Sequence, residues 1–387
     1  MSAVRFGVVG MGMGLGHARG IVADKNGDFC LTAVCDIVEE KARKCGDELK
    51  VPCFTDAQAM YDSGRIDAVI IAVPHYWHAP LAIRAARKGL HVISEKPLAV
   101  TVGAARAMIA ECKKQKVVFG AMLQQRTRGV MMKARELVQS GALGEVFRVQ
   151  MICSSWYRTQ AYYESGAWRG TWDGEGGGIL LNQAPHSLDL FQWLGGMPKR
   201  VIAAVGTRWH KIEVENTANA ICDYGGGKVG YIYATTAEMP GMEQFMLCGD
   251  KATMIIDGGK LRLGTLKQPI TEHLATSEEG FGQVDCDWRD VAIENDPGGK
   301  HINVIRAFAA HVLRGEPLVA TGEEAINELE LSNAIYIAGF KNKTAEIPVD
   351  AAEIDRLIAK LEKERSTGKG QGLRAKAAKE MRKLLGK

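Results

Sequence analysis

The 387-residue sequence has no apolar run that approaches the ~20 residues a membrane-spanning helix needs. Its opening residues, MSAVRFGVVG, also lack the charged region, apolar core and cleavage site of a secretory leader. These absences disfavour membrane and secreted proteins, so we expect a cytoplasmic one. Apolar residues at 46% and charged residues at 24% are ordinary for a globular chain, and the length suits two or three domains.

Cysteine is present, but not in the spacing of a disulfide framework or a zinc site. The nine cysteines are an odd number, and no two of them have CxxC spacing. Several lie in apolar runs such as LTAVCD and NAICDY, where a buried thiol is usual, so we expect a reducing compartment. His210, Glu213, Glu215 and His301 match no metal-ligand spacing, and we expect no metal.

The body of the chain has little net charge. The formal charge is +4, but the last 23 residues, from Arg365, hold eight basic residues and one acid. Without them, 41 basic and 44 acidic residues remain, which argues against a nucleic-acid partner. After Thr367 the chain is a glycine-rich hinge followed by a short basic helical pattern, and we expect a solvated terminal extension.

The first 120 residues or so alternate short β-branched runs with helical patterns. The runs are apolar on both faces, which is typical of parallel strands covered by helices on each side. This alternation predicts a doubly wound parallel α/β domain over residues 1–123. The expected strands are Val4–Gly10, Leu31–Asp36, Ala68–Val73, His91–Ser94 and Val117–Ala121, and the expected helices are Ile37–Leu49, Ala79–Gly89 and Val102–Lys116.

Beyond about residue 145, strand patterns follow one another and are joined by glycine turns at 224–228 and 257–259. Strands joined by such tight turns pair antiparallel. We therefore expect an α+β domain over residues 124–350 with one large open, mainly antiparallel sheet, and a C-terminal helix and basic tail over residues 351–387. The expected strands are Glu145–Trp156, Arg200–Trp209, Thr217–Tyr224, Lys228–Thr236, Gln244–Leu247, Thr253–Asp257 and Lys260–Leu263, and the expected helices are Gly178–Leu194, His301–Gly315 and Glu323–Lys341.

A glycine-rich turn between the first strand and a helix indicates a pyrophosphate site. Its candidate contacts are Gly10, Gly12, Met13 and Gly14, although a strict GxGxxG pattern would need glycine where Leu15 stands. Asp36 ends the second strand, where an acid accepts hydrogen bonds from the adenosine ribose. A carboxylate there repels a 2′-phosphate, so NAD is favoured over NADP. Asp36 also suits a cap of the next helix, and the two roles are compatible.

Lys96 follows the strand His91–Ser94, in the sequence Glu95-Lys96-Pro97. It therefore lies at the carboxyl end of a parallel strand, the edge at which open α/β sheets bind ligands. Pro97 fixes the turn, as suits a lysine held in one orientation.

These pieces resemble the Gfo/Idh/MocA (glucose-fructose oxidoreductase / inositol dehydrogenase) family. The matching motifs are the glycine loop, Ala72-Val73-Pro74 with His75 and His78, EKP, and GGGILLNQAPHSLDL from Gly176 to Leu190. The resemblance covers roughly residues 4 to 350. It implies a Rossmann domain, an open-sheet domain that forms dimer or tetramer contacts in a homo-oligomer, and NAD(P)-dependent chemistry on a sugar or polyol.

The resemblance also implies functional residues. Lys96, Asn182 and His186 would form the catalytic group, although relatives commonly have Asp where Asn182 stands. An amide cannot accept a proton, so Asn182 can only orient a hydroxyl or Lys96. If their segment is helical, Asn182 and His186 share one face. The base is then His186, which titrates near neutral pH, or Lys96, if burial or a neighbouring cation lowers its pKa.

Two further groups complete the candidate site. Aromatic rings stack on sugar C–H faces while arginine and tyrosine satisfy hydroxyls, so the run from Trp156 to Trp172 suits a carbohydrate pocket. It is similar to a sugar- and glycoside-oxidising branch of the family. Further cofactor contacts are expected at Val73, Pro74, His75, His78, Glu95 and Lys96, and substrate contacts at Arg126, Tyr157, Arg158, Trp168, Arg169, Trp172 and His186.

Three functions are consistent with this pattern. The leading hypothesis is an NAD-dependent oxidoreductase that moves a hydride between nicotinamide and a secondary alcohol carbon of a sugar, glycoside or inositol. The alternative is a glycosidase-type enzyme that retains NAD and cleaves a glycosidic bond through transient oxidation and elimination. The missing carboxylate at Asn182 leaves a third, an NAD-binding sensor without catalysis.

Overall fold

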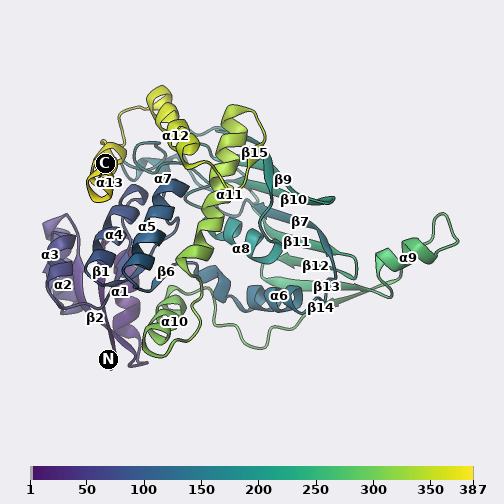
Figure 1. Cartoon of the computed structure of the whole chain (residues 1–387), viewed down its shortest axis with the longest axis horizontal. Helices are drawn as coiled ribbons and strands as arrows, with labels where there is room; N and C mark the ends of the chain where they lie inside the picture. The colour runs from purple at the N-terminus through teal and green to yellow at the C-terminus, as the bar shows by residue number, and fades with distance from the viewer. Residues whose placement is uncertain (1–2, 387) are drawn as a thin grey trace.

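The computed structural model of the protein describes residues 3–386, and its first part is a six-stranded parallel sheet. The strand order is β3-β2-β1-β4-β5-β6, with helices on both faces, as predicted (Figure 1). Alternate residues of β1 serve two cores, since Phe6 and Val8 pack in one layer and Val9 in the other. The elements are β1 (Val4–Val9), α1 (Gly14–Ala23), β2 (Phe29–Cys35), α2 (Glu39–Leu49), β3 (Cys53–Phe54), α3 (Ala57–Asp62), β4 (Ala68–Ile71), η1 (His75–Trp77), α4 (His78–Arg87), β5 (His91–Ser94), α5 (Val102–Lys114) and β6 (Phe119–Ala121).

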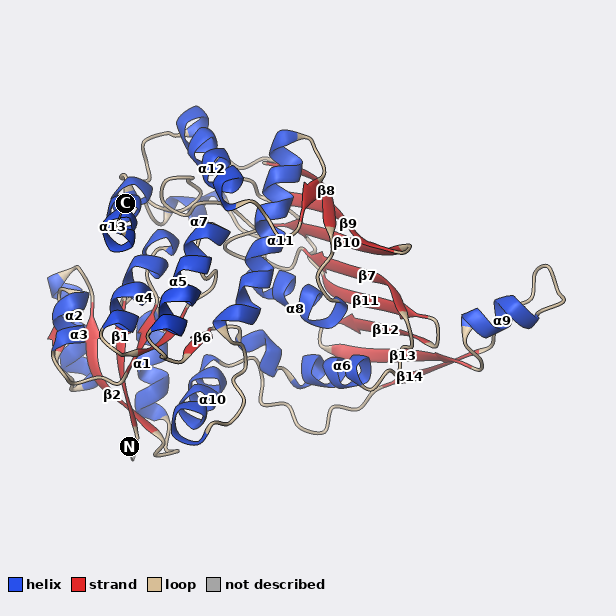
Figure 2. Cartoon of the chain, in the orientation of Figure 1, coloured by secondary structure: helices blue, strands red, loops and turns tan. Residues whose placement is uncertain are grey.

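The second sheet has nine strands in the order β14-β13-β12-β11-β7-β10-β9-β8-β15 (Figure 2). Its neighbours pair antiparallel except β7 and β10, which are parallel, so the sheet is mixed but mainly antiparallel, as expected. The strands are β7 (Val146–Cys153), β8 (Arg200–Gly206), β9 (Thr217–Gly225), β10 (Lys228–Thr235), β11 (Glu243–Gly249), β12 (Ala252–Asp257), β13 (Lys260–Leu266), β14 (Cys286–Asp290) and β15 (Ala345–Glu346).

Within residues 3–386, helices cover one face of this sheet and leave the other uncovered. The covered face packs against α8 (Pro185–Gly195) and α11 (Gly322–Lys341), and α6 (Gly129–Gln139) lies near β13. Apolar side chains remain exposed on the other face, at Ile202, Ile221 and Tyr231. Short elements complete the domain: η2 (Gln124–Thr127), α7 (Gln160–Glu164) and α9 (Ile270–Thr276), which extends from the sheet between β13 and β14 (Figure 1).

One helix from the second half of the chain returns to the first sheet. In α10 (His301–Arg314), Phe308 packs against Phe6 of β1 with ring centroids 6.1 Å apart. The buried residues Val304, Ile305 and Ala309 join the same core. By packing, α10 is therefore part of the Rossmann layer, although it follows the second sheet in sequence.

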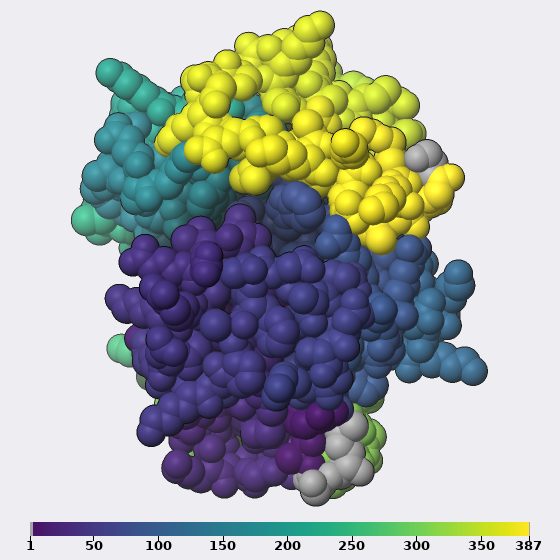
Figure 3. Space-filling view, turned by 90° about the vertical axis from the view of Figure 1, so that its left-hand side faces the viewer, coloured from purple at the N-terminus to yellow at the C-terminus, as the bar shows by residue number. Residues whose placement is uncertain are grey.

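The C-terminal segment is packed rather than solvated, so the expectation of a solvated extension is wrong. After α12 (Ala351–Arg365), helix α13 (Leu373–Leu385) lies against α4 and η1. Its first turn is held by Asp173, whose carboxylate accepts the backbone N–H groups of Leu373 (3.2 Å) and Arg374 (3.0 Å). Arg84 of α4 pairs with Glu380. The yellow segment in Figure 3 accordingly lies across both halves of the molecule.

No helix within residues 3–386 has both the length and the apolar character needed to span a membrane. All nine cysteines are free thiols, of which Cys30, Cys53 and Cys286 are exposed and the others buried.

Candidate active site

The glycine loop after β1 fits a dinucleotide pyrophosphate. Gly10 has φ +92°, and a Cβ atom there would lie 2.2 Å from the carbonyl oxygen of Ala72, so only glycine is accommodated. A Cβ at Gly12 would meet open space. Met13 is 63% exposed, and α1 begins at Gly14. The loop thus presents backbone N–H groups at a helix N-terminus to an accessible surface, which suits a phosphate.

Asp36 connects this loop to the end of β2. Its carboxylate accepts the backbone N–H of Met11 at 2.8 Å and that of Val38 at 3.0 Å. The residue at the N-cap of α2 is Val38, so the second role expected for Asp36, that of helix cap, is wrong. Each carboxylate oxygen retains acceptor capacity, so Asp36 still suits ribose hydroxyls.

The two histidines of the loop after β4 are buried and bonded to the backbone. His75 Nδ1 lies 2.8 Å from the carbonyl oxygen of Glu175, in the second half of the chain. Both ring nitrogens of His78 lie 2.8 Å from carbonyl oxygens, those of Pro97 and Val73. His78 therefore braces the Val73-Pro74 turn against EKP instead of presenting a free nitrogen to a cofactor.

Glu95 also has a structural role, since it bonds to residues on either side of it. Its carboxylate bonds His17 Nε2 of α1 at 2.7 Å and the backbone N–H of Lys96 at 3.1 Å. His301 of α10 stacks edgewise on His17, with centroids 4.8 Å apart. Although burial opposes it, the hydrogen bond and charge of His17 lower the pKa of Glu95 to about 2. Glu95 is therefore a fixed anion that anchors the EKP turn to the glycine-loop helix.

Lys96 reaches across to the second domain. Its Nζ donates a hydrogen bond to the backbone carbonyl oxygen of Asn182 at 2.7 Å. Burial lowers its pKa, while the charges of Glu95, Glu328 and Glu175 oppose that shift. Asn182 lies in the turns that precede α8, not on a helix with His186, because α8 begins at Pro185. The expected shared helix face is therefore wrong: Asn182 lies in the turn and His186 in the first turn of α8, four residues later.

His186 is partly buried, and the charge of Lys96 acts on it. Burial, together with the Lys96 charge, lowers the pKa of His186 to about 3, so its imidazole is neutral near pH 7. Its Nε2 lies 3.3 Å from the side-chain nitrogen of Gln124. Its Nδ1 is buried and has no hydrogen-bond partner among residues 3–386, and such an orphaned atom is the expected contact of a bound ligand.

Glu175 is a member of the site that the sequence analysis missed. Its carboxylate accepts hydrogen bonds from Asn182 Nδ2 and from the backbone N–H of Gly170 (2.7 Å). Burial raises its pKa to about 7, against those hydrogen bonds and the charges of Arg169 and Lys96. In the sequence, the one feature that could have pointed to Glu175 is its position directly before the GGG motif.

Within the GGG motif, Gly178 has no room for a side chain, since a Cβ there would lie 1.7 Å from the Glu215 carbonyl oxygen.

Aromatic and arginine side chains of the 156–172 segment stack beside this group. Arg169 lies over the rings of Tyr162 and Trp168, at 4.5 and 4.6 Å, and donates to the Tyr162 hydroxyl at 2.6 Å. Trp168 faces His75 with ring centroids 6.0 Å apart. The guanidinium of Arg158 also lies over the Tyr162 ring, 4.8 Å from its centroid, and the neighbouring Tyr157 is exposed.

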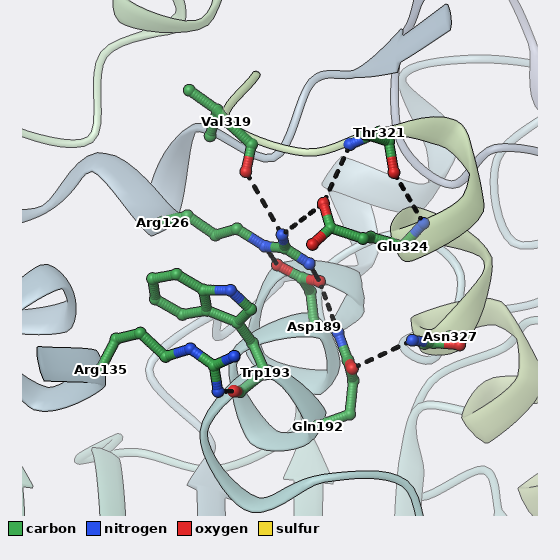
Figure 4. Close-up of polar contacts among 9 residues, drawn as sticks. All are labelled: Arg126, Arg135, Asp189, Gln192, Trp193, Val319, Thr321, Glu324 and Asn327. Atoms are coloured by element: carbon green, nitrogen blue, oxygen red, sulfur yellow. Dashed lines mark hydrogen bonds and ion pairs between the residues drawn. The ribbon is translucent and has the colours of Figure 1, made fainter. Parts of the chain in front are cut away.

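Two residues expected to bind substrate serve the core instead. Trp172 is fully buried, donates from Nε1 to the Glu213 carbonyl oxygen at 2.9 Å and packs edgewise on Tyr336. Arg126 forms a buried bidentate pair with Asp189, at 2.7 and 2.8 Å, and stacks over Trp193 (Figure 4). Its donors are used within the fold, so the substrate contact predicted for each of these residues is corrected.

Within residues 3–386, no three His, Cys, Asp or Glu side chains are grouped as metal ligands. Glu213 and Glu215 instead accept backbone N–H groups, those of Trp172 (3.1 Å) and Leu180 (3.0 Å).

Comparisons with known proteins cover both parts of the chain. An oxidoreductase family with an NAD-binding Rossmann fold matches residues 4–122, and a GFO/IDH/MocA C-terminal domain matches residues 131–255. The myo-inositol 2-dehydrogenase of Thermotoga maritima is 23% identical over 86% of this chain and 95% of the relative. The 2,7-anhydro-N-acetylneuraminate hydratase of Escherichia coli is 26% identical over 71% of this chain and 74% of the relative. The structure of the WlbA dehydrogenase from Bordetella pertussis with NADH and UDP-GlcNAcA has a TM-score of 0.75 at 26% identity, over 90% of this chain and all of that one.

Proposed function

The chain belongs to the GFO/IDH/MocA family of NAD-binding oxidoreductases, and on that premise we propose that Lys96, Asn182 and His186 form its catalytic group. The proposed substrate is a sugar, glycoside or inositol with a secondary alcohol at the reacting carbon. The observation that carries this proposal is the 2.7 Å hydrogen bond by which Lys96 of one domain meets the Asn182 turn of the other.

When bound, NAD would supply the hydride acceptor for oxidation of the alcohol carbon. The residues proposed to hold NAD are Gly10, Gly12, Met13 and Gly14 at the pyrophosphate and Asp36 at the ribose. The Val73-Pro74-His75 turn would line the same pocket. Arg169 and Trp168, with Tyr157 and Arg158 beside them, would contact the sugar.

Lys96 is the proposed acceptor of the hydroxyl proton. Burial disfavours its ammonium form, which increases the share of neutral amine able to take a proton. His186 has a pKa too low to be the acceptor near neutral pH, and it instead donates or accepts a hydrogen bond at the substrate oxygen as a neutral ring. Asn182 orients the same hydroxyl.

The test compares wild type with Lys96→Ala on a panel of inositols, pyranosides, levoglucosan and 3-keto sugars. We expect NADH formation by wild type and a loss of about 10²- to 10⁴-fold in kcat for the variant, with NAD affinity by calorimetry unchanged. A variant that oxidises the panel at the wild-type rate contradicts the assignment.

The hydratase relative supports a second candidate, a redox-neutral elimination that keeps NAD bound. The same panel separates the candidates: net NADH indicates a dehydrogenase, whereas product release without NADH indicates elimination. Tight NAD binding with neither product indicates a sensor.

We also propose a cytoplasmic homo-oligomer. The nine free thiols, three of them exposed, suit a reducing compartment. The uncovered apolar face of the nine-stranded sheet suits a second copy of the chain.

A further inference from the structure

Asn182 stands where the catalytic group would usually have a carboxylate, and a buried carboxylate lies directly behind it. Glu175 Oε1 accepts a hydrogen bond from Asn182 Nδ2. We propose that Glu175 is a positioning residue that fixes the Asn182 amide with its oxygen toward the substrate hydroxyl. This inference rests on the proposed function, since it assigns Asn182 the hydroxyl as its contact.

Hydrogen-bond counting decides which end of the amide is presented. The Asn182 side-chain nitrogen has two N–H groups. One donates to Glu175, and the other is directed at the Tyr162 hydroxyl, 3.3 Å away. The nitrogen end is thereby used within the protein, and the end left for a ligand is Oδ1, which only accepts. The site therefore receives a hydroxyl as a hydrogen-bond donor at Asn182.

Glu175 is itself held in place from two further directions. Its Oε2 accepts the backbone N–H of Gly170 at 2.7 Å, and its own carbonyl oxygen lies 2.8 Å from His75 Nδ1. The residue is 1% exposed. The carboxylate cannot rotate without losing the Gly170 bond, so it links the 156–172 segment to the Asn182 turn, while the backbone carbonyl of Glu175 links both to the Rossmann domain.

The arrangement depends on the ionised form of Glu175. A carboxylate accepts from Asn182 and Gly170 at once, whereas a carboxylic acid has one oxygen that bears a proton and faces one of these donors. Burial raises the pKa of Glu175 to about 7, so the change from carboxylic acid to carboxylate takes place near neutral pH. Charged or titratable groups that act on Glu175 or its hydrogen-bond partners come from η1, α7, α11 and two loops: His75, Tyr162, Tyr163, Tyr336, Lys96 and Arg169.

The experiment is a double-mutant cycle of Glu175→Gln and Asn182→Ala, with the best substrate of the panel. Glutamine has one acceptor oxygen, so its NH2 group must face one of the two N–H donors. We expect Glu175→Gln to lower kcat about 10- to 100-fold with unchanged NAD affinity, and to remove an acid limb of the kcat profile near pH 7. In the Asn182→Ala background the same change should lower kcat less than 2-fold, because the residue that it positions is gone.

Glu330→Gln is the matched control. Glu330 is another buried acid, paired with Arg106 and with the backbone N–H of Val349, and it has no contact with Asn182. We expect its loss to lower thermal stability while kcat and its pH profile stay unchanged. Equal fold-losses from Glu175→Gln with and without Asn182 would overturn the positioning role.

A second readout needs no turnover. In protein labelled with ¹⁵N-asparagine, the Asn182 side-chain NH2 signals should shift with pH around 7 in wild type and stay fixed in Glu175→Gln. Signals that do not move in wild type overturn the inference. If wild type oxidises no member of the panel while these signals do titrate, the proposed function fails and the Glu175–Asn182 link stands.

Discussion

Lys96 and His186 are both partly buried in surroundings that disfavour their charged forms, and the consequence differs for each residue. A lysine whose pKa is lowered gains a neutral form that can accept a proton, whereas a histidine whose pKa falls to about 3 loses its titration from the physiological range. From sequence, histidine is the natural candidate for the base because its unperturbed pKa is near neutral. Burial, which no local pattern reveals for these two residues, reverses that preference.

The pH profile of alcohol oxidation tests this reversal. The active form of Lys96 is the neutral amine, so kcat/KM should rise with pH along a limb whose midpoint lies below the usual lysine pKa of about 10.4. His186→Gln should lower kcat about 10-fold or more through the lost hydrogen bond, yet leave every limb between pH 5 and about 9 in place. If the wild-type pH profile has a limb near pH 6.5 that is lost in His186→Gln, His186 is the base and the assignment to Lys96 is wrong.

At the scale of elements, periodic segments were predictable and the connections between them were not. Strand β5 and helix α10 begin where their patterns predict, because a short apolar β-branched run and a period-3.6 apolar pattern are local properties of the sequence. The start of α8 was also within reach, since Pro185 stands at its first turn. Nothing local distinguishes the buried Trp172 from a pocket ring, because Tyr336 and Phe340 decide its place.

The C-terminal tail shows the same limit. Composition alone favours solvation, but α13 is held by Asp173, about 200 residues earlier in the chain. In the same segment Lys369 donates to the carbonyl oxygen of Tyr163 at 2.6 Å, behind the stacked rings of the site. The tail is therefore a brace for the 156–172 segment.

Asp173→Ala should release this brace. The carboxylate accepts N–H groups at the start of α13, so its loss should cost about 1–3 kcal/mol in unfolding free energy and raise hydrogen exchange over residues 366–386. KM for the sugar substrate should rise while NAD affinity stays constant. Glu364→Ala, which removes an exposed partner of Lys360 on α12, is the control. Unchanged exchange in the tail of Asp173→Ala would contradict the bracing role.

At the scale of the whole molecule, the two domains are closed against each other and one large face stays open. Contacts through Lys96, α10 and α13 unite the halves, and helices bury one side of the nine-stranded sheet. On its other side, Ile202, Ile221 and Tyr231 are 57%, 48% and 42% exposed and are register neighbours across three strands. A contiguous apolar row of this kind on a monomer is typical of a protein interface.

We therefore predict that the chain pairs with a copy of itself through this row, and that Ile221→Asp gives a monomer. In a two-fold pair each substitution enters the interface twice, so two unpaired carboxylates would have to be buried. The fold should survive, because the Ile221 side chain points outward from a chain that already tolerates its exposure. Sedimentation equilibrium at micromolar concentration measures the mass, and circular dichroism checks the fold. Phe281→Asp makes the same charge change at a 99% exposed side chain away from the sheet and should leave the mass unchanged. A monomeric wild type would contradict the predicted pairing. An Ile221→Asp variant that keeps the wild-type mass would show that the chain pairs through another surface.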